Sequence, residues 1–214
     1  MKQILCFGDS NTYGLIPNTT KRYSFEERWT GRLQQLLGYE DYHVVEEGLC
    51  GRTTKFTEKK RQGRNGTKML PFLLETHHPI DKVILMLGTN DCKEEFHAEP
   101  EDIANGIEQL IIQIRLHNPK TEILVVSPIE LGEHVWEERF DPAFHPHSVE
   151  VSKGLKEAYK QITEKYYCDF LAASDFARPS KEDEEHLDIP GHQMLATILY
   201  RKVKGVSSYG SCIY

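Results

Sequence analysis

The stretch KQILCFGDSNTYG, residues 2–14, joins a short apolar run to a turn of glycine, aspartate and serine. Apolar runs of this length are typical of buried β-strands, and Gly8 lets the chain turn sharply where the run ends. Ser10 has two interpretations: it caps the turn, or it lies at the carboxyl edge of a sheet, where open α/β sheets bind ligands. The stretch alone leaves both interpretations open.

The rest of the chain repeats this pattern of strand and turn. Further apolar runs of strand length lie at 42–46, 82–87, 122–126 and 166–171. Segments with helical periodicity or helix-like composition lie at 26–37, 103–116, 149–166 and 193–203. Strands that alternate with helices predict right-handed crossovers and a parallel sheet covered on both faces. We therefore predict an α/β fold, a three-layer α/β/α sandwich of about five parallel strands.

The length of 214 residues suits one well-buried domain, which we expect over 1–204, followed by a tail at 205–214. A long excursion at 129–148 follows the fourth predicted strand and contains three histidines and two prolines. Long loops in compact domains often form lids or contact surfaces. We expect this excursion to contribute to function.

Composition excludes several classes of protein. The net charge of −7 is unlike that of a nucleic-acid-binding surface, and no apolar run approaches the roughly 20 residues of a membrane span. No secretory signal precedes the first strand, so we expect a cytoplasmic location. The five cysteines are far apart and form no CxxC pair, which argues against a disulfide framework and a zinc knuckle.

Polar residues follow four of the predicted strands. These strand ends carry Ser10, the turn 48–54, the segment 88–91 and Ser127. Because the carboxyl ends of parallel strands share one edge of the sheet, we expect these residues to lie near one another. Each of them also has a structural interpretation as a turn or helix cap.

Acyl transfer is a reaction that would use these polar residues at the strand ends together. A serine nucleophile needs a base, an acid that orients the base, and donors for the oxyanion. Ser10, the Gly51 N–H and the Asn90 side chain can supply the nucleophile and donors. His186 is the candidate base because Asp183 lies three residues upstream, where a turn brings both side chains to one side.

Together these motifs resemble the four blocks of the SGNH hydrolases, also called the GDSL family. They are GDS at 8–10, GLCGRTT at 48–54, GTND at 88–91 and D-x-x-H at 183–186. The surrounding segments resemble the branch of bacterial arylesterases and acyltransferases. The resemblance implies a flavodoxin-like topology, a Ser10, His186 and Asp183 triad, and an oxyanion hole made by Ser10, Gly51 and Asn90. It implies no metal and no cofactor.

The sequence departs from the family pattern at two points, and a third assignment has an alternative. Asn11 stands where the family usually has leucine, and the last block reads Asp-Glu-Glu-His instead of Asp-Gly-x-His. Within that acidic cluster, Glu182 or Asp188 could be mistaken for Asp183. Gly48 is an alternative to Gly51 as the second oxyanion donor.

These observations predict a serine esterase that hydrolyses short-chain acetyl or aryl esters through an acyl-enzyme, with transfer to another acceptor as a variant. We place five further residues along the substrate pocket, with packing or ion pairing as the alternative for each: Asp9, Asn11, Tyr13, Trp29 and Arg52. The resemblance and the exposed-looking aromatic residues of 129–148 also predict a homo-oligomer.

Two other functions compete with the esterase. One is a metal-dependent hydrolase that would use Asp9, Asp91, Asp183 and His186, although no HxH or HExxH zinc spacing lies at the strand ends. The other is a flavodoxin-like binding module without catalysis, since a fold does not determine a function. The first strand is followed by neither GxGxxG nor GK[ST].

Overall fold

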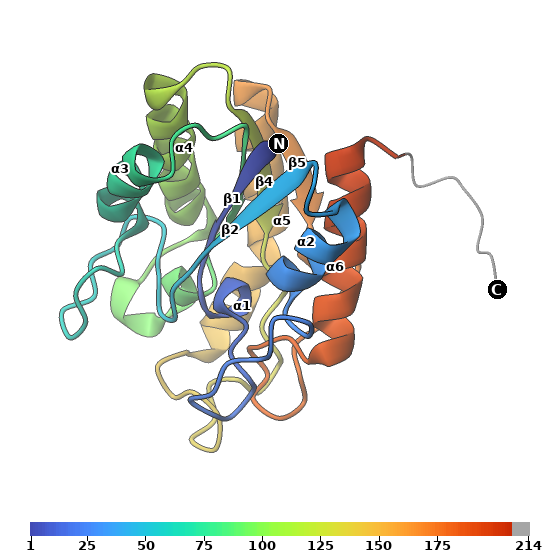
Figure 1. Ribbon diagram of the computed structural model, residues 1–214. Helices are drawn as coiled ribbons and strands as arrows, with labels where there is room; N and C mark the ends of the chain where they lie inside the picture. Colours follow the sequence, from blue (N-terminus) through green and yellow to red (C-terminus); the bar gives the residue numbers. More distant parts are fainter. Residues whose placement is uncertain (207–214) are drawn as a thin grey trace.

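The computed structural model describes residues 1–206, which form a five-stranded parallel sheet with helices on both faces (Figure 1). The strands are β1 Lys2–Gly8, β2 Tyr42–Gly48, β3 Lys82–Met86, β4 Glu122–Ser127 and β5 Asp169–Ala172. Their order in the sheet is β2-β1-β3-β4-β5. This order places the topological switch point between the carboxyl ends of β1 and β3, which is where such sheets bind ligands.

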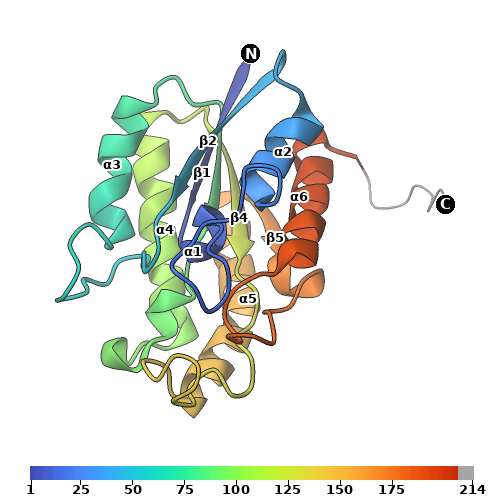
Figure 2. The ribbon, with the colours of Figure 1, turned by 60° about the horizontal axis from the view of Figure 1, so that its bottom comes forward.

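Two helical layers enclose the sheet, with α3, α4 and α5 on one face and α2 and α6 on the other (Figures 1 and 2). The helices are α1 Ser10–Tyr13, α2 Trp29–Leu37, α3 Gly66–Thr76, α4 Pro100–His117, α5 Pro146–Tyr166 and α6 Ile189–Lys204. The predicted three-layer α/β/α sandwich is confirmed.

The side chains of β1 show how the core is divided. Leu5 and Phe7 pack into the cluster that contains α3, α4 and α5, whereas Ile4 and Cys6 pack into the cluster that contains α2 and α6. All four are essentially inaccessible to solvent. Successive residues of a strand point to opposite faces, so a continuous apolar run is what a strand buried on both faces requires.

The fifth strand begins later than predicted. Helix α5 continues to Tyr166, and Tyr167 ends it in the left-handed conformation with φ of 51°. β5 therefore starts at Asp169 and not at 166. The apolar segment 166–171 belongs in part to the helix, because Tyr166 packs on the core as a helical residue.

The excursion at 129–148 is more tightly packed than its composition suggests. Leu131, Val135 and Phe144 are buried in the core cluster next to α5. Its last residues belong to α5, because Pro146 starts that helix and the side chains of His145 and Ser148 form a capping box. Most of the predicted tail, 207–214, lies outside the described residues.

The turn after β1 is tight because Gly8 has no side chain. A Cβ atom there would lie 2.0 Å from Thr12 Oγ1 and 2.8 Å from the Met86 carbonyl oxygen. Gly8 is in register with Gly48 of β2 and Met86 of β3, so three strand ends meet at this level. Among residues 1–206, no helix has the length and apolar character that a membrane crossing requires.

Candidate active site

Ser10 is held at the end of β1 by a short capped helix. Asp9 caps α1 by accepting a hydrogen bond from the Asn11 N–H at 3.0 Å. Ser10 is the first residue of this helix and is only 3% exposed. The interpretation of Ser10 as the cap of this turn is therefore wrong: Asp9 is the cap, and the Ser10 hydroxyl contacts another group.

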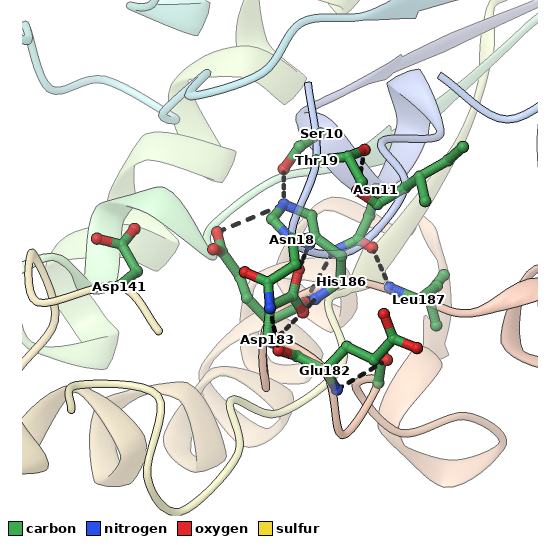
Figure 3. A network of polar contacts seen from close by, with 12 residues as sticks. Ser10, Asn11, Asn18, Thr19, Asp141, Glu182, Asp183, His186 and Leu187 are labelled. Atoms are coloured by element: carbon green, nitrogen blue, oxygen red, sulfur yellow. Dashed lines mark hydrogen bonds and ion pairs between the residues drawn. The ribbon is translucent and has the colours of Figure 1, made fainter. Parts of the chain in front are cut away.

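The Ser10 hydroxyl lies against His186, which in turn lies against Asp183 (Figure 3). The distance from Ser10 Oγ to His186 Nε2 is 2.9 Å, and the distance from His186 Nδ1 to Asp183 Oδ2 is 2.7 Å. All three residues are buried. A relay of serine, imidazole and carboxylate with this geometry can activate a hydroxyl for nucleophilic attack.

The loop before α6 holds the carboxylate in place through backbone groups. Asp183 Oδ1 accepts hydrogen bonds from the N–H groups of Glu185 and His186, and Asp183 Oδ2 accepts one from the Asn18 N–H at 3.1 Å. Glu184 turns the loop with φ of 58°. The turn places Asp183 and His186 side by side, as their spacing predicts.

Asn11 joins the serine turn to this loop. Its Oδ1 accepts a hydrogen bond from the Leu187 N–H at 2.9 Å, and its Nδ2 donates to the Glu185 carbonyl at 3.4 Å (Figure 3). Because both carboxamide ends bond to the backbone on either side of His186, Asn11 positions the imidazole relative to Ser10. It is a structural link and is not free to contact substrate.

The charges in the site favour a protonated imidazole. Burial by itself would lower the pKa of His186, but the Glu185 carboxylate and the hydrogen bond to Asp183 raise it to about 9. Burial would likewise raise the pKa of Asp183, but the hydrogen bond and charge of His186 bring it below its usual value. The pair is thus stabilised as an imidazolium beside a carboxylate.

Three donors lie at the carboxyl edge near this relay. Within residues 1–206, the N–H groups of Ser10 and Gly51 donate to no protein acceptor. Asn90, which starts the 3₁₀ turn Asn90–Cys92 after β3, donates from Nδ2 to the Arg52 carbonyl at 3.3 Å and keeps a second N–H. Donors of this kind are what a tetrahedral oxyanion requires.

Gly51 has a left-handed backbone with φ of 82°, and a Cβ atom there would lie 2.2 Å from the Arg61 guanidinium. Its left-handed backbone therefore favours glycine, whereas the Arg61 side chain is long and could move aside. Gly48, the alternative donor, is the last residue of β2 and the register partner of Gly8. The turn 49–54 carries Gly51 beyond the strand end, toward Asn90, and both residues line one cavity.

The segment after β3 is anchored by a buried acid. Asp91 accepts hydrogen bonds from the Thr54 N–H and the Thr54 hydroxyl, and burial raises the pKa of Asp91 to about 7. These bonds tie the Asn90 turn to the turn that carries Gly51. Asp91 thus has a positioning role that its type alone did not reveal.

Four of the five predicted pocket residues are buried, and Trp29 and Arg52 are two of these four. Trp29 is fully buried among the apolar residues of α2 and α6. Arg52 is 3% exposed, donates to the Gly8 carbonyl at 2.9 Å and to the Glu47 carbonyl, and stacks over the Phe7 ring. Arg52 therefore stabilises the turn that carries Ser10 through its hydrogen bond to the Gly8 carbonyl.

The other three pocket residues surround Ser10 in the chain. Asp9 is 1% exposed, and its burial raises its pKa to about 6. Asn11 forms the link described above. Tyr13 is partly exposed, and Arg22 lies over its ring at 4.5 Å. Only Tyr13 among the five thus keeps an exposed surface near the turn.

His192, a second buried histidine six residues after His186, belongs to the core and not to this relay. It is fully buried in α6 and its Nδ1 accepts a hydrogen bond from the Trp29 N–H at 3.2 Å. Burial lowers the pKa of His192 to about 3, so this imidazole stays neutral. It connects α2 to α6.

A small cavity of about 140 Å³ opens beside Gly51 and Asn90. Charged side chains form much of its wall, including Arg61, which pairs with Glu58 at 2.7 Å, and Lys93. A larger cavity of about 290 Å³ lies at the opposite, amino edge of the sheet, away from Ser10. We associate the smaller cavity with the site because two of the three donor residues, Gly51 and Asn90, line it.

The carboxylates proposed for a metal site are engaged otherwise. Asp91 bonds to Thr54, and Asp183 bonds to His186 and to backbone N–H groups. Within the part of the chain that the structure describes, no group of three or more His, Cys, Asp or Glu side chains is arranged to hold a metal ion. The arrangement of these carboxylate and histidine side chains therefore does not favour a metal-dependent hydrolase.

Comparison with known proteins agrees with this geometry. The pattern of the GDSL-like lipase/acylhydrolase family matches residues 6–194. The aryl esterase of M. smegmatis has 33% sequence identity and a TM-score of 0.90, over 97% of this chain and 100% of that chain. A carbohydrate acetylesterase from Sinorhizobium meliloti has 36% identity and a TM-score of 0.87, over 97% and 100% of the two chains. No curated protein sequence matches.

The chain belongs to the GDSL-like lipase/acylhydrolase family. The resemblance inferred from the four motifs is thereby confirmed. The protein is an SGNH-type serine esterase, whose substrates are small acyl esters.

Proposed function

We propose that the protein hydrolyses short-chain acyl esters through a covalent acyl-enzyme on Ser10, with His186 and Asp183 completing a triad. The observation that carries this proposal is the chain of two short contacts, 2.9 Å from Ser10 Oγ to His186 Nε2 and 2.7 Å from His186 Nδ1 to Asp183 Oδ2. It lies next to three donors suited to an oxyanion.

In the first step His186 Nε2 takes the Ser10 proton while Ser10 Oγ forms a bond to the ester carbonyl carbon. The carbonyl oxygen becomes an oxyanion, which the N–H groups of Ser10 and Gly51 and the Asn90 side chain would stabilise. The C–O bond to the alcohol then breaks, and the alcohol leaves with the proton from Nε2. Asp183 keeps the imidazole in the tautomer with Nδ1–H throughout.

In the second step a water molecule gives its proton to His186 Nε2 and attacks the acyl carbon. The bond to Ser10 Oγ breaks, and Nε2 returns the proton to Ser10. An alcohol in place of water would give acyl transfer by the same route. Nothing in the described geometry requires a metal or an organic cofactor.

The size of the cavity supports a short acyl group. At about 140 Å³, with charged side chains in its wall, it suits an acetyl or similar group better than a long apolar chain. The relatives act on aryl esters and carbohydrate acetates, by their names. Cytoplasmic location, a single domain over 1–204 and self-association remain predictions from the sequence.

Hydrolysis of p-nitrophenyl acetate by the wild type and Ser10→Ala, each with and without a chelator, tests this proposal. We expect turnover by the wild type, loss of at least about 10³-fold in kcat for Ser10→Ala, and no effect of the chelator. Equal turnover by the two proteins would contradict the serine mechanism. Loss of activity with the chelator would favour the metal-dependent alternative.

A further inference from the structure

Glu185 brings a second carboxylate to the imidazole, at the ring nitrogen that faces Ser10. Glu185 Oε1 lies 3.8 Å from His186 Nε2, whereas Asp183 Oδ2 lies 2.7 Å from Nδ1. The Glu185 side chain is only 8% exposed. Glutamate is seldom buried to this extent unless it has a partner, so this side chain calls for an explanation.

The Glu185 carboxylate has only one cationic neighbour within residues 1–206, His186, at 3.8 Å. No lysine or arginine pairs with it there, and no donor lies within hydrogen-bond distance. Its backbone is fixed on both sides, because the N–H donates to Asp183 and the carbonyl accepts from Asn11. Asp183 and Glu185 together bring two carboxylates to one imidazole, so the loop keeps a net negative charge beside Nε2 even when His186 is protonated.

The position of this charge indicates which part of a substrate would meet it. Nε2 is the atom that would pass a proton to the leaving alcohol, so the alcohol oxygen must approach it. The acyl group would lie on the other side, by Gly51 and Asn90, where the cavity wall carries both signs of charge, including Arg61 and Glu58. The alcohol side, in contrast, is next to the Glu185 carboxylate, which no lysine or arginine neutralises within residues 1–206.

We propose that Glu185 selects the leaving alcohol by its charge, so that the esterase favours esters of alcohols that carry a positive group over esters of anionic alcohols. Amino alcohols and quaternary ammonium alcohols are the favoured class. Coulombic attraction at a water-poor site changes binding of a charged group by about tenfold or more over a separation of about 6 Å. This inference rests on the proposed function and adds a specificity to it.

Two phenyl acetates of opposite charge test the proposal: one with a meta-trimethylammonium group and one with a meta-sulfonate group. The ratio of their kcat/KM values is measured for the wild type and for Glu185→Gln, which keeps the shape of the side chain. Differences in intrinsic reactivity cancel when the two proteins are compared. We expect the preference for the cation to fall by about tenfold in Glu185→Gln.

Glu182→Gln is the matched control, because Glu182 belongs to the same acidic loop but is exposed. We expect its ratio to stay within about twofold of the wild type, since exposed charges are screened. If Glu185→Gln left the ratio of the two kcat/KM values unchanged while hydrolysis still required Ser10, charge selection by Glu185 would be overturned and the proposed function would stand. Hydrolysis that does not depend on Ser10 would overturn the proposed function instead.

Inhibition of the wild type provides a test that needs no variant. We expect phenyltrimethylammonium to compete with phenyl acetate at least about tenfold more strongly than benzenesulfonate does. Equal inhibition, or stronger inhibition by the sulfonate, would overturn the proposal.

Discussion

Ser10 and His186 lie 176 positions apart in the chain, and Ser10 Oγ is 2.9 Å from His186 Nε2. Ser10 follows the first strand of the sheet, and His186 precedes the last helix. They meet because both lie at the carboxyl edge of the parallel sheet, and because Asn11 bonds to the backbone on each side of His186.

Asp183→Asn should lower kcat by about 10³- to 10⁴-fold while the protein stays folded. Asparagine would favour the tautomer of His186 with the proton on Nε2, which cannot accept a proton from Ser10. Steady-state kinetics with p-nitrophenyl acetate measures the effect, and Glu182→Gln is the control. A loss in Glu182→Gln as large as in Asp183→Asn would mean that the orienting acid is assigned to the wrong residue.

Asn90→Ala should lower kcat by about 10²- to 10³-fold with a much smaller change in KM, because an oxyanion donor acts mainly in the transition state. Asn118→Ala, at the far edge of the sheet, should leave both constants nearly unchanged. If Asn90→Ala raised KM and left kcat unaltered, Asn90 would be a binding residue and not an oxyanion donor.

The rate should depend on pH through His186. Its neutral form is the one that accepts the Ser10 proton, and its pKa is raised to about 9. Four titratable groups face or surround this ring: Asp183, Glu185, Asp9 and His192. We expect kcat/KM to rise with pH up to a plateau above about 9, and the midpoint to fall in Glu185→Gln.

The blank for this pH profile is Ser10→Ala, which accounts for spontaneous hydrolysis at high pH. A profile that is flat from pH 6 to 10 would contradict a base whose pKa is raised. A midpoint that rises in Glu185→Gln would contradict the role of the Glu185 charge.

Asn11→Ala should both destabilise the protein and slow catalysis. It leaves the Leu187 N–H and the Glu185 carbonyl without partners in a buried place, at a cost of about 1 to 3 kcal/mol in the free energy of unfolding. Urea unfolding measures the stability. Asn18→Gly removes a bond to the exposed carbonyl of Glu182, and glycine suits the left-handed backbone there, so it should cost less than about 1 kcal/mol. Equal costs would contradict the role of Asn11 as a link.

Much of the site was predictable from the sequence because its residues follow strands. A parallel sheet brings strand ends together, so Ser10, Gly51 and Asn90 could be placed at one edge, and the spacing of Asp183 and His186 predicted their contact. The apolar stripe of the helix at 26–37 already indicated that Trp29 could be a core residue, as the structure shows.

Other features depend on backbone geometry that composition does not reveal. Arg52 and Glu185 are charged residues of types that are usually exposed. The sequence around them does not indicate that Arg52 lies over Phe7 or that Glu185 lies beside His186. Asn18 helps to hold Asp183 through its backbone N–H, and its backbone is left-handed with φ of 57°. No side-chain pattern could have indicated it.

The central claim is that Ser10 forms the covalent intermediate, and labelling with diisopropyl fluorophosphate tests it most directly. Ser10 Oγ would displace fluoride and form one stable phosphoester, which intact-mass spectrometry and peptide mapping detect. We predict a single adduct on the peptide that contains Ser10, with loss of esterase activity in proportion to labelling, and no adduct in Ser10→Ala. An adduct on another residue, or full activity in the labelled protein, would contradict the account.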